Sequence, residues 1–166
     1  MENLYLKIAE TIGRNEALFT AAGVPVPQTV DIYLGQPSAP DQFEFALPAV
    51  FVDYSADYEA GLLYVYLHVL QDFGYDTESF SPNSADGLSY FRFLTVLKRC
   101  LKGVKTPPVF GAFKLYQETP VQTNFFYYHQ LTLRCTLCSD IYPEETKYTD
   151  TEFAKNIAGG RLKETL

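Results

Sequence analysis

The sequence has few of the residues that usually mark a catalytic or metal centre. In 166 residues it has no Trp, one Met, two His and three Cys. Three Cys without the spacing of a secreted disulfide framework indicate a reducing compartment and buried free thiols. Basic residues are also scarce, since 13 Lys and Arg stand against 20 Asp and Glu, a net charge of −7. This balance argues against a general binder of nucleic acid or anionic membranes, because both require a basic surface.

Long apolar runs and the familiar catalytic motifs are absent as well. No run of about eighteen apolar residues occurs, so no membrane-spanning helix is expected. The opening MENLYLKIAETIG lacks the basic and then apolar order of a signal peptide. The patterns GxxxxGK[ST], GxGxxG, GxSxG and HExxH are all missing. We therefore expect a protein made in the cytoplasm, with no enzymatic activity, no metal and no cofactor.

Aromatic residues, in contrast, are abundant. The chain has 13 Tyr and 13 Phe, and 47% of its residues are hydrophobic. Its length is typical of one domain with a single core. Tyr and Phe are favoured at the desolvated centres of protein contacts. Part of the aromatic surface is therefore expected to be an interface.

The central stretch of the sequence is residues 48–71, which predicts two strands, Ala49–Tyr54 and Leu62–Gln71, joined by a short acidic turn. Side chains alternate in the second strand. One face carries Leu63, Val65, Leu67 and Val69, and the other carries Tyr64, Tyr66 and His68. The aliphatic face is expected to pack under helices. A Tyr ring has an apolar body and a polar hydroxyl, so the second face can remain half-exposed or contact another subunit.

The remaining elements are predicted from periodicity and from Gly and Pro breaks. They are an N-terminal helix over residues 2–22 with a break near Gly13, a strand over Thr29–Gly35, a loop over 72–85 with Phe73, Tyr75 and Phe80, a helix over Asp86–Lys102, and strands over Phe110–Thr119 and Asn124–Ser139 turned at Pro120–Thr123. The central helix presents a stripe of Leu88, Phe91, Leu94, Leu97 and Leu101, widened by Tyr90 and Phe93.

This order of elements predicts an α+β fold. A mostly antiparallel β-sheet of about four to five strands packs against an N-terminal helix and a central helix. Residues 1–140 form a single domain in this interpretation. Residues 141–166 form a polar C-terminal extension, with a short helix expected at Thr151–Ala158.

Three clusters could carry chemistry, and each also has a structural interpretation. Cys135 and Cys138 form a CxxC pattern, but inside a strand their side chains point to opposite faces, which favours structural thiols. Asp53, Asp57 and Glu59 could hold Ca²⁺ or Mg²⁺, yet the EF-hand spacing is missing, so a solvated turn is favoured. The two histidines, His68 and His129, are expected to be hydrogen-bonded residues of the sheet.

The segments TVDIYLGQP, PAVFVDY, LLYVYLHVLQD and YFRFLTVLKRCLKG, with the short N-terminal helix and the closing hairpin, carry a family resemblance. Over about residues 4–140 the chain resembles the tail terminator and tail completion (head–tail joining) proteins of tailed phages and prophages, in the form seen in Bacteroidetes phages. Residues after Ile141 have no counterpart in this resemblance.

The resemblance implies a structural subunit of the virion. Such subunits close into a ring, commonly of six, at the head-proximal end of the tail tube, where they stop tube polymerisation and join head to tail. The implied partners are further copies of the chain, the tail tube protein and neck or connector proteins. DNA would pass through the lumen without specific binding, and no membrane is involved.

A ring subunit needs two different complementary patches, because its contacts are heterologous. The residues expected at the assembly interface or lumen are Asp53, Asp57, Tyr58 and Glu59 in the turn, Tyr64 and Tyr66 on the sheet, and Phe73, Tyr75 and Phe80 in the loop. Two alternatives remain: another neck, tail or baseplate protein of similar fold, and a cytoplasmic small-ligand binding module or enzyme.

Overall fold

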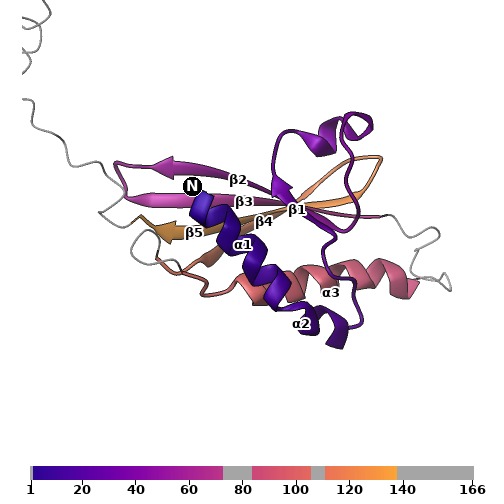
Figure 1. Ribbon diagram of the computed structural model, residues 1–166. Helices are drawn as coiled ribbons and strands as arrows, with labels where there is room; N and C mark the ends of the chain where they lie inside the picture. Colours follow the sequence, from indigo (N-terminus) through magenta and orange to yellow (C-terminus); the bar gives the residue numbers. More distant parts are fainter. Residues whose placement is uncertain (1, 73–83, 106–110, 138–166) are drawn as a thin grey trace, which may run out of the picture.

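The computed structural model describes residues 2–72, 84–105 and 111–137, which form a five-stranded mixed sheet with helices on one face (Figure 1). The predicted α+β fold is confirmed, including both helices. The helices are α1 (Glu2–Arg14), α2 (Glu16–Ala21) and α3 (Ser84–Leu101), with short 3₁₀ turns η1 (Gln36–Ser38) and η2 (Pro40–Gln42). The strands are β1 (Thr29–Ile32), β2 (Ala49–Asp57), β3 (Leu62–Gln71), β4 (Lys114–Val121) and β5 (Tyr127–Thr136).

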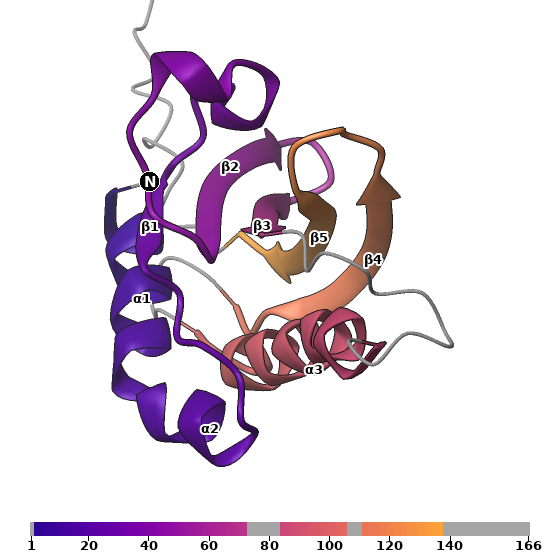
Figure 2. The same cartoon turned by 90° about the vertical axis from the view of Figure 1, so that its right-hand side faces the viewer.

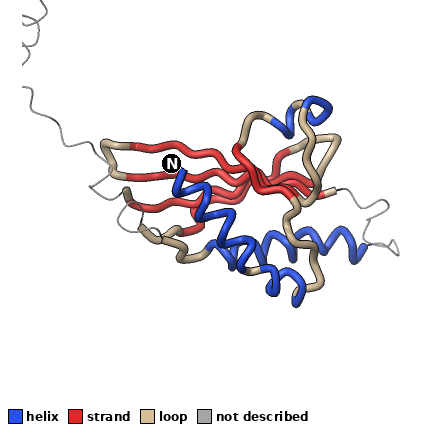
Figure 3. Tube along the Cα trace, in the orientation of Figure 1, coloured by secondary structure: helices blue, strands red, loops and turns tan. Residues whose placement is uncertain are grey.

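The strands, red in Figure 3, form one sheet with the order β1-β2-β3-β5-β4. β1 and β2 are its one parallel pair within the described residues. β3 lies at its centre and pairs antiparallel with β2 and β5. β1 pairs only with Ala49–Val52, so the part of β2 from Asp53 to Asp57 has β3 as its one neighbouring strand in the described chain. β4, at the opposite edge, pairs with β5 alone within the same residues. Both long edges of the sheet therefore present backbone groups that could pair with another chain.

The main core lies between the sheet and the helices, as the alternation in β3 predicts. All four residues of the predicted aliphatic face are completely buried: Leu63, Val65, Leu67 and Val69. α1 contributes Leu4, Ile8 and Ile12 at helical spacing. The Tyr5 hydroxyl also donates a hydrogen bond to the Val30 carbonyl, 2.9 Å away, which ties α1 to β1.

The predicted stripe on the central helix is partly wrong. Leu94, Leu97 and Leu101 are buried, as are Tyr90 and Phe93, but Leu88 and Phe91 are 56% and 57% exposed. α3 has apolar residues on more than one side, and the side with Leu94, Leu97 and Leu101 belongs to the core that α1 and the sheet share. Periodicity identified the helix correctly but could not select between these sides.

A second, smaller cluster lies on the opposite face of the sheet. Ala49, Phe51 and Leu70 are buried there under aromatic residues of the loop after β1 and of the β4–β5 hairpin: Tyr33, Phe45, Phe126 and Tyr128. Gln36 fixes this loop, since its side chain accepts a hydrogen bond from the Leu34 amide and donates one to the Ile32 carbonyl. In a view along the strands, the loop and the helices α1 and α3 lie on opposite sides of the curved sheet (Figure 2).

Several predicted strand boundaries are shifted. The first strand ends at Ile32, because Gly35 turns the chain with a φ of 91°. β2 extends to Asp57 rather than Tyr54. The turn of the second hairpin follows Val121, whereas it was predicted to begin at Pro120. Pro120 lies in β4 because this is an edge strand, in which a residue without a backbone N–H is tolerated. The extension predicted for residues 141–166 lies outside the described residues.

Candidate assembly interface

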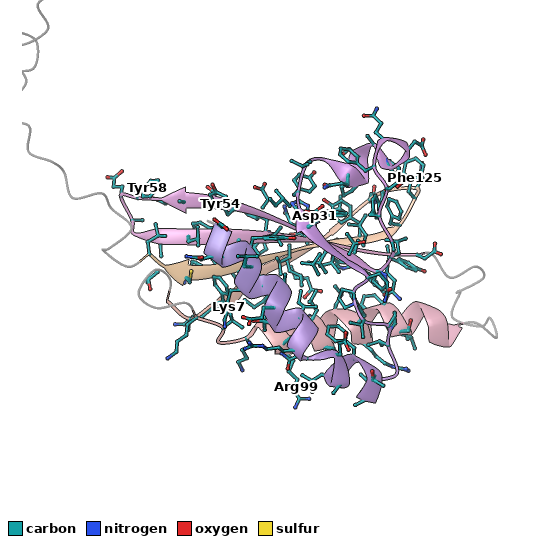
Figure 4. The ribbon with its side chains drawn as sticks, in the orientation of Figure 1. Lys7, Asp31, Tyr54, Tyr58, Arg99 and Phe125 are labelled. Carbon is teal, nitrogen blue, oxygen red and sulfur yellow. The ribbon has the colours of Figure 1, made fainter. Side chains whose placement is uncertain are left out.

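Four of the predicted interface residues lie at or near the end of the β2–β3 hairpin. Asp53, Asp57, Tyr58 and Glu59 are all exposed, and Figure 4 shows Tyr58 at the far end of this hairpin. The turn itself is shorter than predicted, since Asp53 and Asp57 belong to β2. Asp53 therefore lies within the sheet, opposite Tyr66, and Asp57 is the last residue of β2, opposite Leu62. Tyr58 and Glu59 lie in the turn beyond it.

The end of this hairpin has a defined shape. The Asp57 carboxylate accepts a hydrogen bond from the Ala60 amide at 2.8 Å. Gly61 has a φ of 63°, a left-handed conformation that side chains other than Gly rarely adopt. Residues 57–61, which we call the hairpin tip, are thus fixed before any partner binds. Preorganisation of this kind lowers the entropic cost of association.

Tyr64 and Tyr66 lie half-buried on the sheet face away from the helices, as predicted. The sequence did not reveal that Tyr116 and Arg134 join them there. The Tyr64 and Tyr116 rings meet edge to face with centroids 5.6 Å apart, and the Arg134 guanidinium lies 5.0 Å from the centroid of the Tyr116 ring. A register shift between Leu115 and Gln117 inserts Tyr116 into β4, so simple alternation could not place it.

The three aromatic residues predicted in the loop, Phe73, Tyr75 and Phe80, lie outside the described residues. Their part in an interface stays a prediction.

Both histidines are hydrogen-bonded residues of the sheet, as predicted. His68 is 5% exposed, and its Nδ1 and the Tyr128 hydroxyl are hydrogen-bonded at 2.5 Å. His129 Nδ1 and the Tyr90 hydroxyl are paired at 2.7 Å. Burial lowers the pKa of both imidazoles, for His68 to about 4. Nε2 of His68 has no hydrogen-bond partner within the described ranges.

Within residues 2–72, 84–105 and 111–137, no group of three His, Cys, Asp or Glu side chains has an arrangement that could hold a metal ion. Cys100 and Cys135 are buried, as expected of structural thiols, and burial raises the pKa of the Cys100 thiol. Cys138 lies outside the described residues.

A groove between α3 and β4 is a surface that the sequence did not reveal. It encloses about 720 Å³, and its floor includes the buried Phe113 and Leu133 and the half-exposed Leu115. Its rim carries four basic residues, Lys98, Arg99, Lys102 and Lys114. Two backbone hydrogen bonds connect the loop after α3 to the segment before β4 at one end of the groove. The Gly103 amide donates to the Phe113 carbonyl, and the Phe113 amide donates to the Val104 carbonyl. We call it the basic groove.

A second groove of about 720 Å³ lies beside the β4–β5 hairpin. It is lined by Pro37, Ser38 and residues 120–129, including the exposed Phe125. No Asp, Glu, Lys or Arg is among the residues that line it. It therefore offers stacking and apolar contact rather than a charged site.

Comparison with family models finds no family that matches this sequence, and comparison with curated proteins finds no significant relative. In the described part of the chain, no helix combines the length and apolar character needed to cross a membrane.

Proposed function

We propose that this chain is a structural subunit of a tailed-phage virion, a tail terminator or head–tail joining protein that forms a ring, commonly hexameric, on the end of the tail tube. The sequence resemblance suggests this role, and the α+β fold with its two principal helices is the fold which that resemblance implies. The proposed partners are further copies of the chain, the tail tube protein and neck proteins. No cofactor or enzymatic activity is part of the proposal.

The observation that carries the proposal is the pair of unlike open edges of the sheet. The outer half of β2 and the whole of β4 lack an outer strand in the described ranges. A ring of identical subunits joins one surface of each copy to a different surface of the next. Two open edges with different side chains provide two such surfaces, whereas a self-contained monomer usually protects its sheet edges.

The acidic composition also supports the proposal. A net charge of −7 and the exposed Asp53 do not attract phosphate. A tube that conducts DNA requires a lumen to which DNA does not adhere, because like charges repel.

The test is to locate the chain in particles. Purified particles of the phage or prophage that encodes it would be analysed by mass spectrometry and labelled with a specific antibody for electron microscopy. Label at the head-proximal end of the tail is expected. Label at another part of the tail or at the baseplate would favour the alternative virion role, and absence from particles would reject both.

A further inference from the structure

The hairpin tip and the basic groove have opposite charges and both lie toward the end of the sheet where β2 ends and β4 begins. Figure 4 shows Tyr58 at the end of the β2–β3 hairpin and Arg99 on the lower side, well apart in the view. The tip carries Asp57 and Glu59, and the groove rim carries four of the thirteen basic residues of an acidic chain. No ion pair joins the two surfaces within the described residues of one subunit, so their charges can meet between two copies.

We propose that the hairpin tip of one subunit docks into the basic groove of the next. The inference rests on the proposed ring assembly and identifies its interface. Asp57 and Glu59 would face Arg99, Lys102 and Lys114, and the exposed Tyr58 would cover the apolar floor of the groove. The contact is heterologous, as a ring requires.

The charges at both surfaces are available for such pairing. Lys98 is already bonded to Glu118 at 2.7 Å. Arg99, Lys102 and Lys114 are exposed, and the structure gives them no ion pair with a described acidic residue. The same holds for Asp57 and Glu59, whose carboxylates form no ion pair within the described ranges. Pairing them across an interface would offset unbalanced charge on both sides and align the two copies.

The reach of the hairpin also fits. β4 begins at Lys114, opposite Arg134, and Arg134 lies opposite Tyr64 of β3. Residues 57–61 continue beyond that line, so the hairpin tip projects past the start of the edge strand (Figure 1). A projecting and internally bonded tip can enter a neighbour's groove without rearrangement of either sheet.

The experiment measures self-association of the full chain by sedimentation at several salt concentrations, up to millimolar protein, with negative-stain imaging. The hairpin variant is Asp57→Asn with Glu59→Lys, which keeps an acceptor for the Ala60 amide. The groove variant is Arg99→Glu with Lys102→Gln. A matched control, Asp41→Asn with Glu44→Lys, makes the same change of charge at exposed positions in or after η2. Circular dichroism checks that every variant is folded.

We expect each of the first two variants to weaken association by roughly tenfold or more at low salt. The control should leave it unchanged, and the hairpin and groove changes combined in one chain should recover part of it, because Glu59→Lys then faces Arg99→Glu. Salt should weaken the wild-type association.

Association that survives both variants would overturn the inference while leaving the virion role intact. Loss in the groove variant alone would assign the groove to another acidic segment and also overturn it. A wild-type chain that stays monomeric at millimolar concentration would overturn it too, and the virion role would then depend on the particle analysis. Charge-sensitive closed dimers would support the contact but contradict a ring.

Discussion

The His68 imidazole stacks on the Tyr33 ring, with the ring centroids 3.8 Å apart and the planes 10° from parallel. Tyr33 directly follows β1, and His68 lies in the central strand, so the contact fastens the loop that covers the second cluster to the sheet. The hydrogen bond between His68 Nδ1 and the Tyr128 hydroxyl extends the connection to β5. Three parts of the chain thus meet at one buried imidazole.

This arrangement predicts a loss of stability in acid. The pKa of His68 is lowered by burial to about 4 in the folded protein, against about 6.5 when the chain is unfolded. As the pH falls from 6.5 towards 4, the unfolded chain takes up a proton that the folded protein does not. The stabilisation is therefore complete above pH 6.5 and is lost progressively down to about pH 4, by an amount on the order of 1–3 kcal/mol.

Urea denaturation near neutral pH and near pH 4.5 would measure this loss. His68→Gln should reduce the difference between the two conditions. His129→Gln serves as the comparison, because its pKa is also lowered, from a less buried position. An equal loss of stability in wild type and His68→Gln would contradict the account.

Replacing two leucines of α3 by Ala should have very different effects on the free energy of unfolding. Leu94 is 1% exposed and Leu88 is 56% exposed. Leu94→Ala leaves a cavity in the main core and should lower the free energy of unfolding by about 2–5 kcal/mol. Leu88→Ala should change it by less than about 0.5 kcal/mol. Denaturant titration of both variants tests the assignment of the buried side of α3, which would be wrong if the two effects were similar.

Gly111 is required by a close approach between the chain and β5. A Cβ at this position would lie 2.4 Å from Oγ1 of Thr136, and the Gly111 amide donates a hydrogen bond to the Thr136 carbonyl. Gly111→Ala should therefore destabilise the fold by about 1–3 kcal/mol. The added Thr136→Ala substitution, which removes that oxygen, should recover part of the loss.

Gly13→Ala is the control for this prediction. Nothing lies within 4 Å of a Cβ at Gly13, which is part of α1. Ala is favoured over Gly inside a helix, so this variant should be more stable by about 0.5–1 kcal/mol. Thermal unfolding separates the two cases, and equal destabilisation by both alanines would contradict the close approach.

The contact between Arg134 and Tyr116 should be measurable as a coupling. The guanidinium lies 5.0 Å from the centroid of a ring that is 54% exposed. A double-mutant cycle with Arg134→Met and Tyr116→Leu should give a coupling of about 0.5–1 kcal/mol. A coupling near zero would mean that this pair does not order the sheet face away from the helices, which we call the open face. The same variants keep the core intact, so they can also be used to test the open face in assembly.

Much of the fold could be predicted from the sequence because period-two and helical patterns follow from burial. The alternate residues Leu63, Val65, Leu67 and Val69 show this, as do Leu4, Ile8 and Ile12, since each set lies on one buried face. The parallel pairing of β1 with β2 could not be predicted, because alternation along one strand does not specify which strand it pairs with or in which direction.

Less of the candidate interface was predictable. The acidic hairpin and the Tyr face were evident from local sequence. The basic groove combines residues of α3, β4 and β5 that are far apart in sequence, and Tyr116 is placed by a β-bulge. Neither leaves a local pattern, because both arise from tertiary packing.

The central claim is that this chain ends the tail tube and joins it to the head. Its most direct test is electron microscopy of particles made by the encoding phage or prophage after deletion of the gene, with and without its restoration. The account predicts overlong tails without heads in the deletion and normal particles after restoration. Tails of normal length, joined to heads in the absence of the chain, would contradict it.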